Sequence, residues 1–369
     1  MTQTNSNPIN QADVTLWGIT IGSVSWDPKQ QVGFFSYARD FLQSGIELSP
    51  IQMPLSTEIY NFPALNKNTY KGLPGLLADA LPDKFGNLLI NQWLQQQGRD
   101  PKGFSPVERL CYIGTRGMGG LEFIPSIRRD HEKAVDLQVG ALVKLANQVL
   151  SNQSGLNTQL TNHDDAQNEL NLRNIISVGT SAGGARAKAV IAWNKKTQQV
   201  KSGQVKCPEG FEHYLLKFDG ISNNRDKELC DPQGFGRTEY AYYRMALAAG
   251  INMSECQLLE ENGRAHFMTQ RFDRLSSSKK LHMQSLCAIA HFDFNIAGAY
   301  SYEQAMQVMK QLDLINLQTA LEQQYRRMVF NVIARNQDDH TKNIAFLNRL
   351  VDDCINGILR TYLYRSLSH

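Results

Sequence analysis

A run of polar residues between two apolar segments holds the side chains best suited to chemistry. Residues 335–343, with the sequence RNQDDHTKN, follow the apolar segment 328–334 and precede the strand-like segment 344–347. In this run Asn343 follows Asp338 by five residues. A carboxylate and an amide at this spacing suit phosphoryl transfer, in which the carboxylate accepts the proton of a hydroxyl group and the amide holds a magnesium ion. A polar loop built from turn-forming residues would explain the same run.

A second run is rich in glycine and precedes a strand-like segment. Residues 179–188 have the sequence GTSAGGARAK and lead into the apolar segment 189–193. Glycines let main-chain N–H groups surround a phosphate, and neighbouring basic residues add positive charge. The run is not a Walker A loop, because Gly184 is followed by Ala-Arg instead of Lys and Ser or Thr. A hairpin turn remains an alternative explanation of the glycines.

A third candidate is Lys217, in the strand-like segment 213–219. A lysine in a strand usually faces solvent, but this one follows Lys188 by 29 residues, on the next predicted strand. Protein kinases place their phosphate-pairing lysine there, and Glu239, at the start of the following predicted helix, could be its ion-pair partner. Each signal is weak alone. Their order along the chain, glycine loop, strand lysine, helix glutamate and then D-x-x-x-x-N, favours a kinase.

The elements that must position these residues fall into two parts. Alternating residues in 14–37 predict a β-meander, 73–97 predicts helices with a break at 81–83, and the glycines of 114–125 predict a tight loop leading into a last strand. After a polar segment, a second part begins with strands at 188–194 and 213–218. It continues with a helix at 238–249, which Gly250 ends, and with strands up to residue 271. A mostly helical region begins at 281, and 344–347 and 358–364 form a hairpin.

Composition limits the possible classes of protein. The chain has 369 residues, of which 42% are hydrophobic, and its net charge is +3. These values exclude collagen-like, wholly disordered and membrane proteins, and the net charge is too small for a general nucleic-acid coat. The six cysteines are scattered, which argues against a zinc site or a disulfide framework. The first twenty residues lack the features of a signal peptide, so we expect a cytoplasmic protein.

The sequence resembles the HipA-type serine/threonine kinases, which are toxins of bacterial type II toxin–antitoxin modules. The resemblance extends from about residue 14 to residue 347. The motifs that carry it are LPD at 81–83, GMGGL at 117–121, SAGGARAK at 181–188, QRFDR at 270–274 and N-x-D-x-H-x-K-N at 336–343. It implies an α+β fold with an N-terminal domain followed by a two-lobed, protein-kinase-like domain.

The family also implies roles for particular residues, with ATP and Mg²⁺ as cofactors. Asp338 would be the catalytic base, Asn343 a magnesium ligand, and Ser181 the serine that is autophosphorylated, with Thr180 as a neighbouring candidate. Lys217 would hold the phosphates under the glycine loop, and the main chain around 270–272 would meet the adenine. The implied ATP-binding residues are Gly179, Thr180, Ser181, Ala182, Gly183, Gly184, Lys217, Gln270, Arg271, Phe272, His340 and Lys342.

The predicted domains are a HipA-like N-terminal domain at 1–147, a polar linker at 148–173 and a kinase domain at 174–369. Family members continue after the catalytic loop into a Pro-x-Tyr-Asp segment whose aspartate is the second magnesium ligand. Residues 358–369, ILRTYLYRSLSH, contain no aspartate. We therefore expect a kinase domain truncated in its helical lobe.

Three functions remain open at this stage. The first is an ATP-dependent kinase toxin that phosphorylates a protein of the translation machinery, such as an aminoacyl-tRNA synthetase, and so arrests growth. The second is an inactive remnant that binds a HipB-like DNA-binding antitoxin and acts as a co-repressor. The third is an unrelated nucleotide-binding protein. In the first two, contact with DNA would be only indirect, through the antitoxin, and no membrane would be involved.

Overall fold

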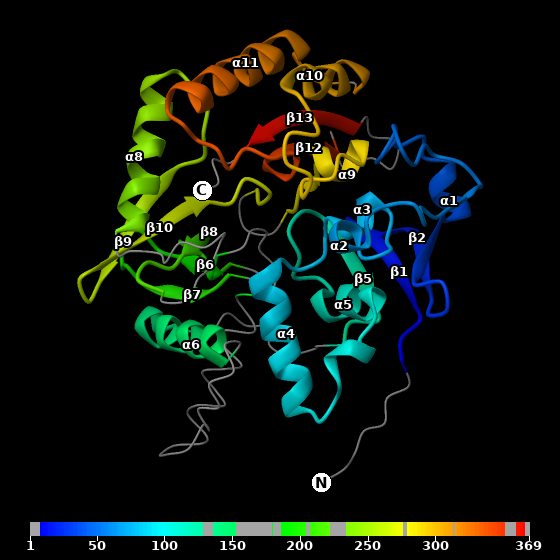
Figure 1. The fold of residues 1–369 in the computed structure, drawn as a ribbon, viewed down its shortest axis with the longest axis horizontal. Coiled ribbons are helices and arrows are strands. Elements are labelled where there is room, and N and C mark those ends of the chain that lie inside the picture. The colour runs from blue at the N-terminus through cyan, green and yellow to red at the C-terminus, as the bar shows by residue number, and fades with distance from the viewer. Residues whose placement is uncertain are drawn as a thin grey trace.

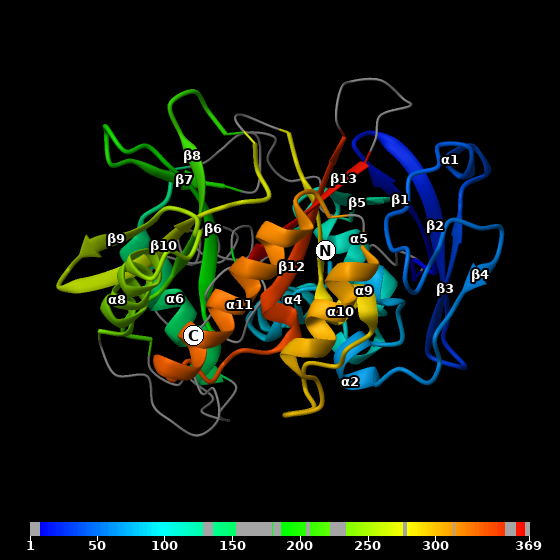
Figure 2. The ribbon, with the colours of Figure 1, turned by 90° about the horizontal axis from the view of Figure 1, so that it is seen from above.

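The computed structural model describes residues 8–127, 136–152, 179, 186–203, 207–221, 234–275, 279–312, 314–350 and 359–365. In these residues three antiparallel sheets organise the chain (Figure 1). Two views at right angles show the first sheet and the second sheet on opposite sides of the molecule, with β12 and β13 of the third sheet between them (Figures 1 and 2). The predicted α+β architecture is confirmed.

The first sheet is the predicted β-meander with one strand added at its edge. The turn between its first two strands is formed by Trp17 and Gly18, both with positive φ, at 53° and 81°. Two such residues match the right-handed twist of a two-residue hairpin, and glycine fits the second position without strain. The strand order is β4-β3-β2-β1-β5, with β1 (Gln11–Leu16), β2 (Ile19–Asp27), β3 (Val32–Tyr37), β4 (Ile59–Tyr60) and β5 (Leu121–Ile124).

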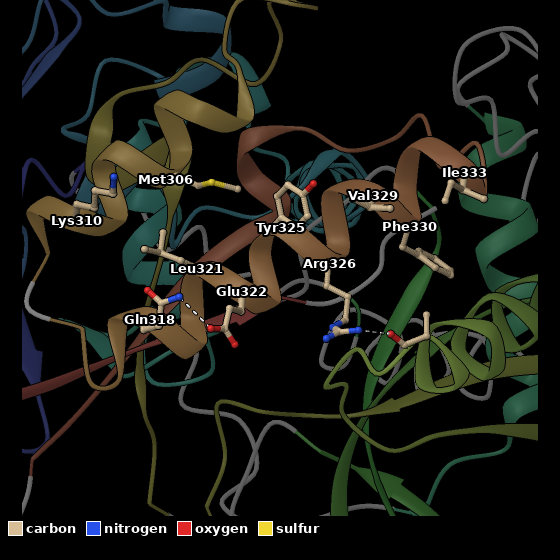
Figure 3. A pocket seen from close by; sticks show the side chains of 11 residues that line it. Met306, Lys310, Gln318, Leu321, Glu322, Tyr325, Arg326, Val329, Phe330 and Ile333 are labelled. Atoms are coloured by element: carbon tan, nitrogen blue, oxygen red, sulfur yellow. Dashed lines mark hydrogen bonds between the residues drawn. The ribbon is translucent and has the colours of Figure 1, made fainter.

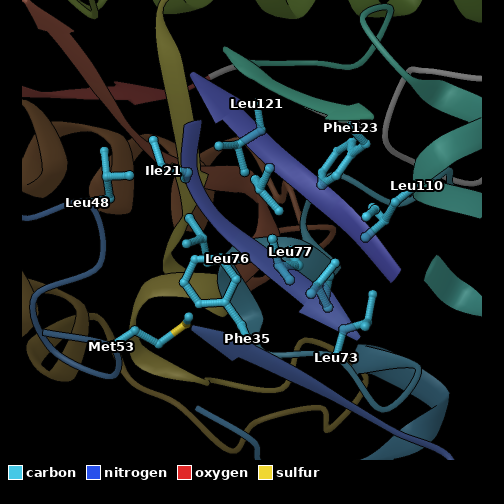
Figure 4. Close-up of a cluster of buried hydrophobic side chains, with 14 of the residues drawn as sticks. Ile21, Phe35, Leu48, Met53, Leu73, Leu76, Leu77, Leu110, Leu121 and Phe123 are labelled. Atoms are coloured by element: carbon cyan, nitrogen blue, oxygen red, sulfur yellow. The ribbon is translucent and has the colours of Figure 1, made fainter. Parts of the chain in front are cut away.

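Short helices cover this sheet and enclose its apolar core. Ile21, Phe35, Leu77 and Phe123 are among the fully buried side chains that meet there (Figure 4). The helices of this part of the chain are α1 (Arg39–Leu42), α2 (Lys67–Tyr70), α3 (Gly75–Ala78), α4 (Lys84–Gln96), η1 (Pro101–Gly103), α5 (Pro106–Ile113) and α6 (Val139–Asn152).

The predicted helix break at 81–83 separates α3 from α4. Asp83 is the N-cap of α4, and its Oδ1 accepts a hydrogen bond of 2.6 Å from the N–H of Gly86. A capping carboxylate satisfies an N–H group that has no partner within the helix. The sequence L-P-D thus ends one helix and starts the next.

The second sheet has the strand order β7-β6-β8-β10-β9. The helix α8 (Phe235–Ala248) follows β8 and ends before Gly250, whose φ of 72° is the left-handed conformation predicted for it. The strands are β6 (Lys188–Trp193), β7 (Val200–Ser202), β8 (Glu212–Lys217), β9 (Cys256–Glu261) and β10 (Arg264–Gln270).

The third sheet joins β11 (His282–Ser285), β12 (Ile344–Leu350) and β13 (Leu359–Arg365). The predicted hairpin is present, with Ile344 opposite Arg365. The helical elements of this region are α9 (Leu286–Ala290), α10 (Tyr302–Gln311), α11 (Leu317–Ile333) and η3 (Thr341–Asn343).

One apolar core links the two parts of the chain. The buried face of α4, with Phe85 and Leu89, packs together with Ile191 of β6 and Tyr214 of β8. The helix α6 joins the same core, and it includes residues 148–152, where the polar linker was predicted to begin. The helix continues to residue 152 because Val149 and Leu150 are buried against the sheet. Residues 153–173 of the predicted linker lie outside the described residues.

Candidate functional site

The last residue of β8, Lys217, forms an ion pair with Glu239 of α8. The Lys217 Nζ lies 3.0 Å from Glu239 Oε2, and the two side chains are 12% and 4% exposed. Arg186 approaches the same carboxylate, with Nη1 at 3.5 Å from Oε1. The pair predicted from the order of the motifs is therefore present. It holds a lysine ammonium at the end of a central strand of the second sheet.

A second buried lysine stands beside Lys217. Lys188 begins β6 and is directly opposite Lys217 in the β6–β8 register. Its Nζ lies 3.3 Å from Oδ2 of Asp83, and both side chains are 3% exposed. Burial lowers the pKa of Lys188 and raises the pKa of Asp83, and the opposite charge of the partner offsets part of each shift. This pair was not predicted from the sequence, although the L-P-D motif contains its carboxylate.

The predicted catalytic loop follows α11 and folds back on itself through Asn343. The Nδ2 of Asn343 donates to the main-chain carbonyl of Asp338 at 2.6 Å, and its N–H donates to the carbonyl of His340 at 2.8 Å. The Asp338 side chain is 39% exposed, and its Oδ1 is 3.8 Å from His340 Nε2. Thr341 anchors the loop by donating to the carbonyl of Phe292 at 2.6 Å. The structure thus brings Asp338 and Asn343 together.

The neighbouring carboxylate, Asp339, has different surroundings. Its Oδ2 accepts a hydrogen bond of 2.6 Å from Asn331 of α11 and a second from the hydroxyl of Tyr302 of α10. Asn331 in turn accepts from Asn336 at 3.1 Å. These contacts tie Asp339 to the helices, whereas Asp338 keeps an exposed carboxylate. Asn331 and Tyr302 were not singled out from the sequence, because nothing in their local pattern indicates a polar network.

His340 and Lys342 flank the ring of Phe294. The ring centroids of His340 and Phe294 are 5.1 Å apart, and Lys342 Nζ is 5.5 Å from the Phe294 centroid. Burial raises the pKa of Asp83, and the positive charge of Lys342 opposes part of that rise. The predicted catalytic loop therefore lies within electrostatic range of the carboxylate that pairs with Lys188.

The segment expected to meet adenine is held firmly by hydrogen bonds within the protein. The N–H of Gln270 donates to the carbonyl of Glu255 at 2.8 Å, and the N–H of Arg271 donates to the carbonyl of His213 at 2.9 Å. The Arg271 side chain forms two hydrogen bonds to Asp273, at 2.8 and 2.7 Å. The N–H groups of Gln270 and Arg271 are therefore already used within the protein.

The same aspartate connects the QRFDR motif to the GMGGL motif. Asp273 is fully buried and accepts hydrogen bonds from Arg274 at 2.8 Å and from the N–H of Gly119 at 2.7 Å. Arg274 also donates to the carbonyl of Gly117 at 2.8 Å. These two motifs therefore form one structural unit that joins the first part of the chain to the end of β10.

The glycine loop is described at its first residue only. Gly179 is buried, and a Cβ added there would lie 2.6 Å from Leu89 and 3.2 Å from Phe85, both on α4. The predicted ATP-binding residues Thr180 to Gly184, including Ser181, lie outside the described residues. The same holds for residues 351–358 and 366–369 at the two ends of β13.

The donor atoms present suit ATP and magnesium in part. Because Nδ2 of Asn343 donates to the Asp338 carbonyl, its amide oxygen is the atom left for a cation, and oxygen is the ligand that Mg²⁺ prefers. The ammonium group of Lys217 is a cation of the kind that pairs with phosphate in kinases. Among the described residues no group of three or more His, Cys, Asp or Glu side chains could hold a metal ion.

A separate groove of about 820 Å³ lies between α10 and α11 and reaches Ala249 after α8 (Figure 3). Leu321, Tyr325, Val329 and Ile333 of α11 line it together with Met306 of α10. None of the predicted site residues is among its lining residues. The groove is thus distinct from the lysine pair and the catalytic loop.

Four cysteines, Cys111, Cys207, Cys256 and Cys287, are buried and free of disulfides. No described helix is long and apolar enough to cross a bilayer.

Comparison with known proteins identifies the family. Residues 12–124 match the family model of the HipA N-terminal domain, and residues 180–355 match that of the HipA-like C-terminal domain. No curated protein matches the chain. A chain of the solved complex of the Shewanella oneidensis MR-1 toxin–antitoxin system, HipA, HipB and its operator DNA, is similar over 96% of this chain and 75% of its own length. Its TM-score is 0.61 at 17% sequence identity, which shows a common fold. With both family models matched in order along the chain and the fold shared, this protein belongs to the HipA family.

Proposed function

We propose that the chain is a HipA-like toxin that acts as a serine/threonine protein kinase, transferring the γ-phosphate of ATP to a protein hydroxyl group. The observation that carries this proposal is the Lys217–Glu239 ion pair at 3.0 Å between β8 and α8. Protein kinases require such a pair between a strand lysine and a helix glutamate, because it holds the lysine on the nucleotide phosphates.

Each residue of the proposed site would have its own role. Lys217 would donate to phosphate oxygens while Glu239 fixes its direction. Asp338, with its exposed carboxylate, would orient the substrate hydroxyl group and accept its proton. The amide oxygen of Asn343 would bind Mg²⁺, which when bound neutralises charge on the phosphates. Asp339 would fix the position of the loop through the hydrogen bonds that it accepts from α10 and α11.

The rest of the proposed ATP site follows the family. Residues 179–184 would cover the phosphates, the main chain at 270–272 would contact the adenine, and His340 and Lys342 would face the nucleotide from the catalytic loop. Ser181 would be the site of autophosphorylation. Its phosphate would carry a charge of about −1.5 to −2 and would be attracted to nearby Arg186.

The proposed partners are a HipB-like DNA-binding antitoxin and a protein substrate of the translation machinery, such as an aminoacyl-tRNA synthetase. The support for the antitoxin is the similarity to a chain of the Shewanella oneidensis complex of HipA, HipB and operator DNA. Phosphorylation of the substrate would arrest growth. We place the protein in the cytoplasm, where buried free thiols such as Cys111 and Cys287 remain reduced.

A phosphate-transfer experiment tests the proposal. The purified chain is incubated with magnesium and ATP labelled at the γ-phosphate, and label transferred to the chain itself and to proteins of a cell lysate is counted. Asp338→Ala should remove the transfer, and Asp27→Ala, in an exposed turn, is the matched control. Binding of ATP and antitoxin without any transfer would favour the co-repressor function instead. Absence of both binding and transfer would overturn the kinase proposal.

A further inference from the structure

The first turn of α8 lies directly on the main chain of β10. A Cβ atom added to Gly236 would be 1.9 Å from the carbonyl oxygen of Ala265 and 3.1 Å from the main-chain nitrogen of Phe267. Both are main-chain atoms, which cannot turn aside as the end of a flexible side chain can. Only glycine, which has no Cβ, allows the helix to approach the strand this closely.

The carboxylate of Asp219 joins the same two elements. Its Oδ1 accepts a hydrogen bond of 2.9 Å from the N–H of Gly234, the N-cap of α8, and its Oδ2 accepts one of 3.3 Å from the N–H of Ala265 in β10. The N–H of Asp219 in turn donates to Nδ1 of the buried His266, also in β10, at 2.9 Å. Its negative charge lies at the N-terminus of the helix, where the helix dipole favours an anion. Asp219 is thus fixed on β10 and holds the start of α8.

The position of β10 also determines where the lysine of the ion pair lies. Lys217, at the end of β8, is directly opposite Phe267 of β10. Glu239 follows Gly236 by three residues, about one turn of the helix, so moving the first turn of α8 away from β10 also moves Glu239 away. The distance of 3.0 Å between Lys217 Nζ and Glu239 Oε2 therefore depends on how close the start of α8 stays to β10.

We propose that Asp219 is a positioning residue for the Lys217–Glu239 pair. By joining Gly234 to Ala265, it keeps the first turn of α8 on β10, where Glu239 reaches Lys217. The inference rests on the proposed function in one respect only, the role of Lys217 in holding ATP.

The first measurement needs no nucleotide. The full chain is treated briefly with a small amine-acylating ester, and mass spectrometry gives the acylation rate of Lys217, whose Nζ must leave Glu239 before it can react. Asp219→Asn keeps the size of the side chain but directs an amide donor toward one of the two N–H groups, so one hydrogen bond is lost. The rate should rise by about fivefold, the factor expected for one hydrogen bond. Calorimetric titration with magnesium and ATP should show affinity weaker by about the same factor.

A double-mutant cycle with Glu239→Gln distinguishes positioning from a general structural effect. Glu239→Gln removes the ion pair, so adding Asp219→Asn should change the acylation rate and the ATP affinity by less than about twofold. Gly236→Ala displaces α8 by a different route, because its Cβ needs space that the Ala265 carbonyl occupies. It should change both quantities in the same direction, and its effect should likewise be small with Glu239→Gln.

Asp79→Asn is the matched control. Asp79 also accepts two hydrogen bonds, from the N–H and the hydroxyl of Ser285, at 2.7 and 2.9 Å, and it lies outside α8 and the second sheet. Its replacement should lower the melting temperature about as much as Asp219→Asn does. It should leave the acylation of Lys217 and the affinity for ATP unchanged.

The outcomes separate this inference from the proposed function. If Asp219→Asn and Gly236→Ala leave the acylation rate of Lys217 unchanged, the positioning role of Asp219 is wrong. It is also wrong if their effects persist in full with Glu239→Gln, or if Asp79→Asn has an equal effect. If acylation responds as expected but the unaltered chain binds no ATP, the inference holds and the proposed function fails.

Discussion

Replacing Asp273 with asparagine is the strongest single test of how the two parts of the chain are joined. Asp273→Asn keeps the shape of the side chain but removes its charge. In the native chain this carboxylate accepts two hydrogen bonds from Arg271, one from Arg274 and one from the N–H of Gly119, all between 2.7 and 2.8 Å. An asparagine amide would direct donors toward guanidinium groups that are themselves donors.

The expected loss follows from burial. Asp273 is 0% exposed, and the side chains of Arg271 and Arg274 are 1% and 8% exposed. Opposite charges about 4 Å apart attract by about 4 kcal/mol at an effective dielectric constant of 20. Desolvation of the carboxylate cancels part of this attraction, and removing one partner of a buried ion pair costs about 3–5 kcal/mol of stability. Because two guanidinium groups lose their counter-ion, we expect a loss in the upper half of that range.

Denaturant unfolding, followed by circular dichroism and tryptophan fluorescence, measures this loss. The control is Glu260→Gln in the surface pair with Arg237, which has a similar distance of 2.8 Å but side chains that are 64% and 60% exposed. It should change the free energy of unfolding by less than about 1 kcal/mol. If Asp273→Asn also costs less than about 1 kcal/mol, the buried cluster does not join the two parts as we describe.

Three other predictions concern acid, the catalytic loop and the glycine loop. The two arginines and the Gly119 N–H hold the pKa of Asp273 far below its usual value. The contribution of this carboxylate to stability is therefore present above about pH 4 and is lost as the pH falls toward the lowered pKa. Unfolding measured from pH 6 to pH 3 should show a smaller loss of stability in Asp273→Asn than in the unaltered chain. Asp338→Asn should abolish phosphate transfer and change stability by no more than about 0.5 kcal/mol. Tyr302→Phe should instead lower stability by about 1–2 kcal/mol, because Asp339 loses a hydrogen-bond donor. Transfer assays and thermal unfolding distinguish the two effects, and a destabilised Asp338→Asn would contradict the separate roles of the two carboxylates. Gly179→Val should destabilise by about 1–3 kcal/mol because its side chain would clash with α4; an unchanged melting temperature would refute this packing.

Local patterns in the sequence were sufficient for most elements and for one ion pair. Alternation and glycine turns predicted the first sheet and the β12–β13 hairpin, and Gly250 ended α8 where expected. The Lys217–Glu239 pair could be predicted because a strand and the next helix in the chain bring these residues together. Such features depend on neighbours in sequence, for which spacing is informative.

The remaining features depend on contacts between distant segments. The pairing of Asp83 with Lys188, and of Asp273 with Gly119, joins residues whose own surroundings show only a helix cap and a turn. The buried side of α6 likewise extended the helix into a segment whose composition predicted a linker. These contacts arise from packing, which single-sequence patterns do not specify. The roles of the site residues and the domain boundaries stay predictions.

The position of α4 has a consequence for dividing the chain into fragments. By sequence α4 belongs to the region that matches the HipA N-terminal domain, yet its buried face completes the core of the second sheet. A fragment that began at residue 180 would leave Ile191 and Tyr214 without the helix that covers them, and buried apolar surface of this kind, once uncovered, promotes aggregation. The region that matches the HipA-like C-terminal domain is therefore a poor unit for transplantation into another protein, and its insolubility when expressed alone would not indicate that it lacks activity. Co-expression with residues 1–152 would supply both α4 and α6, the helices whose buried faces pack in this core.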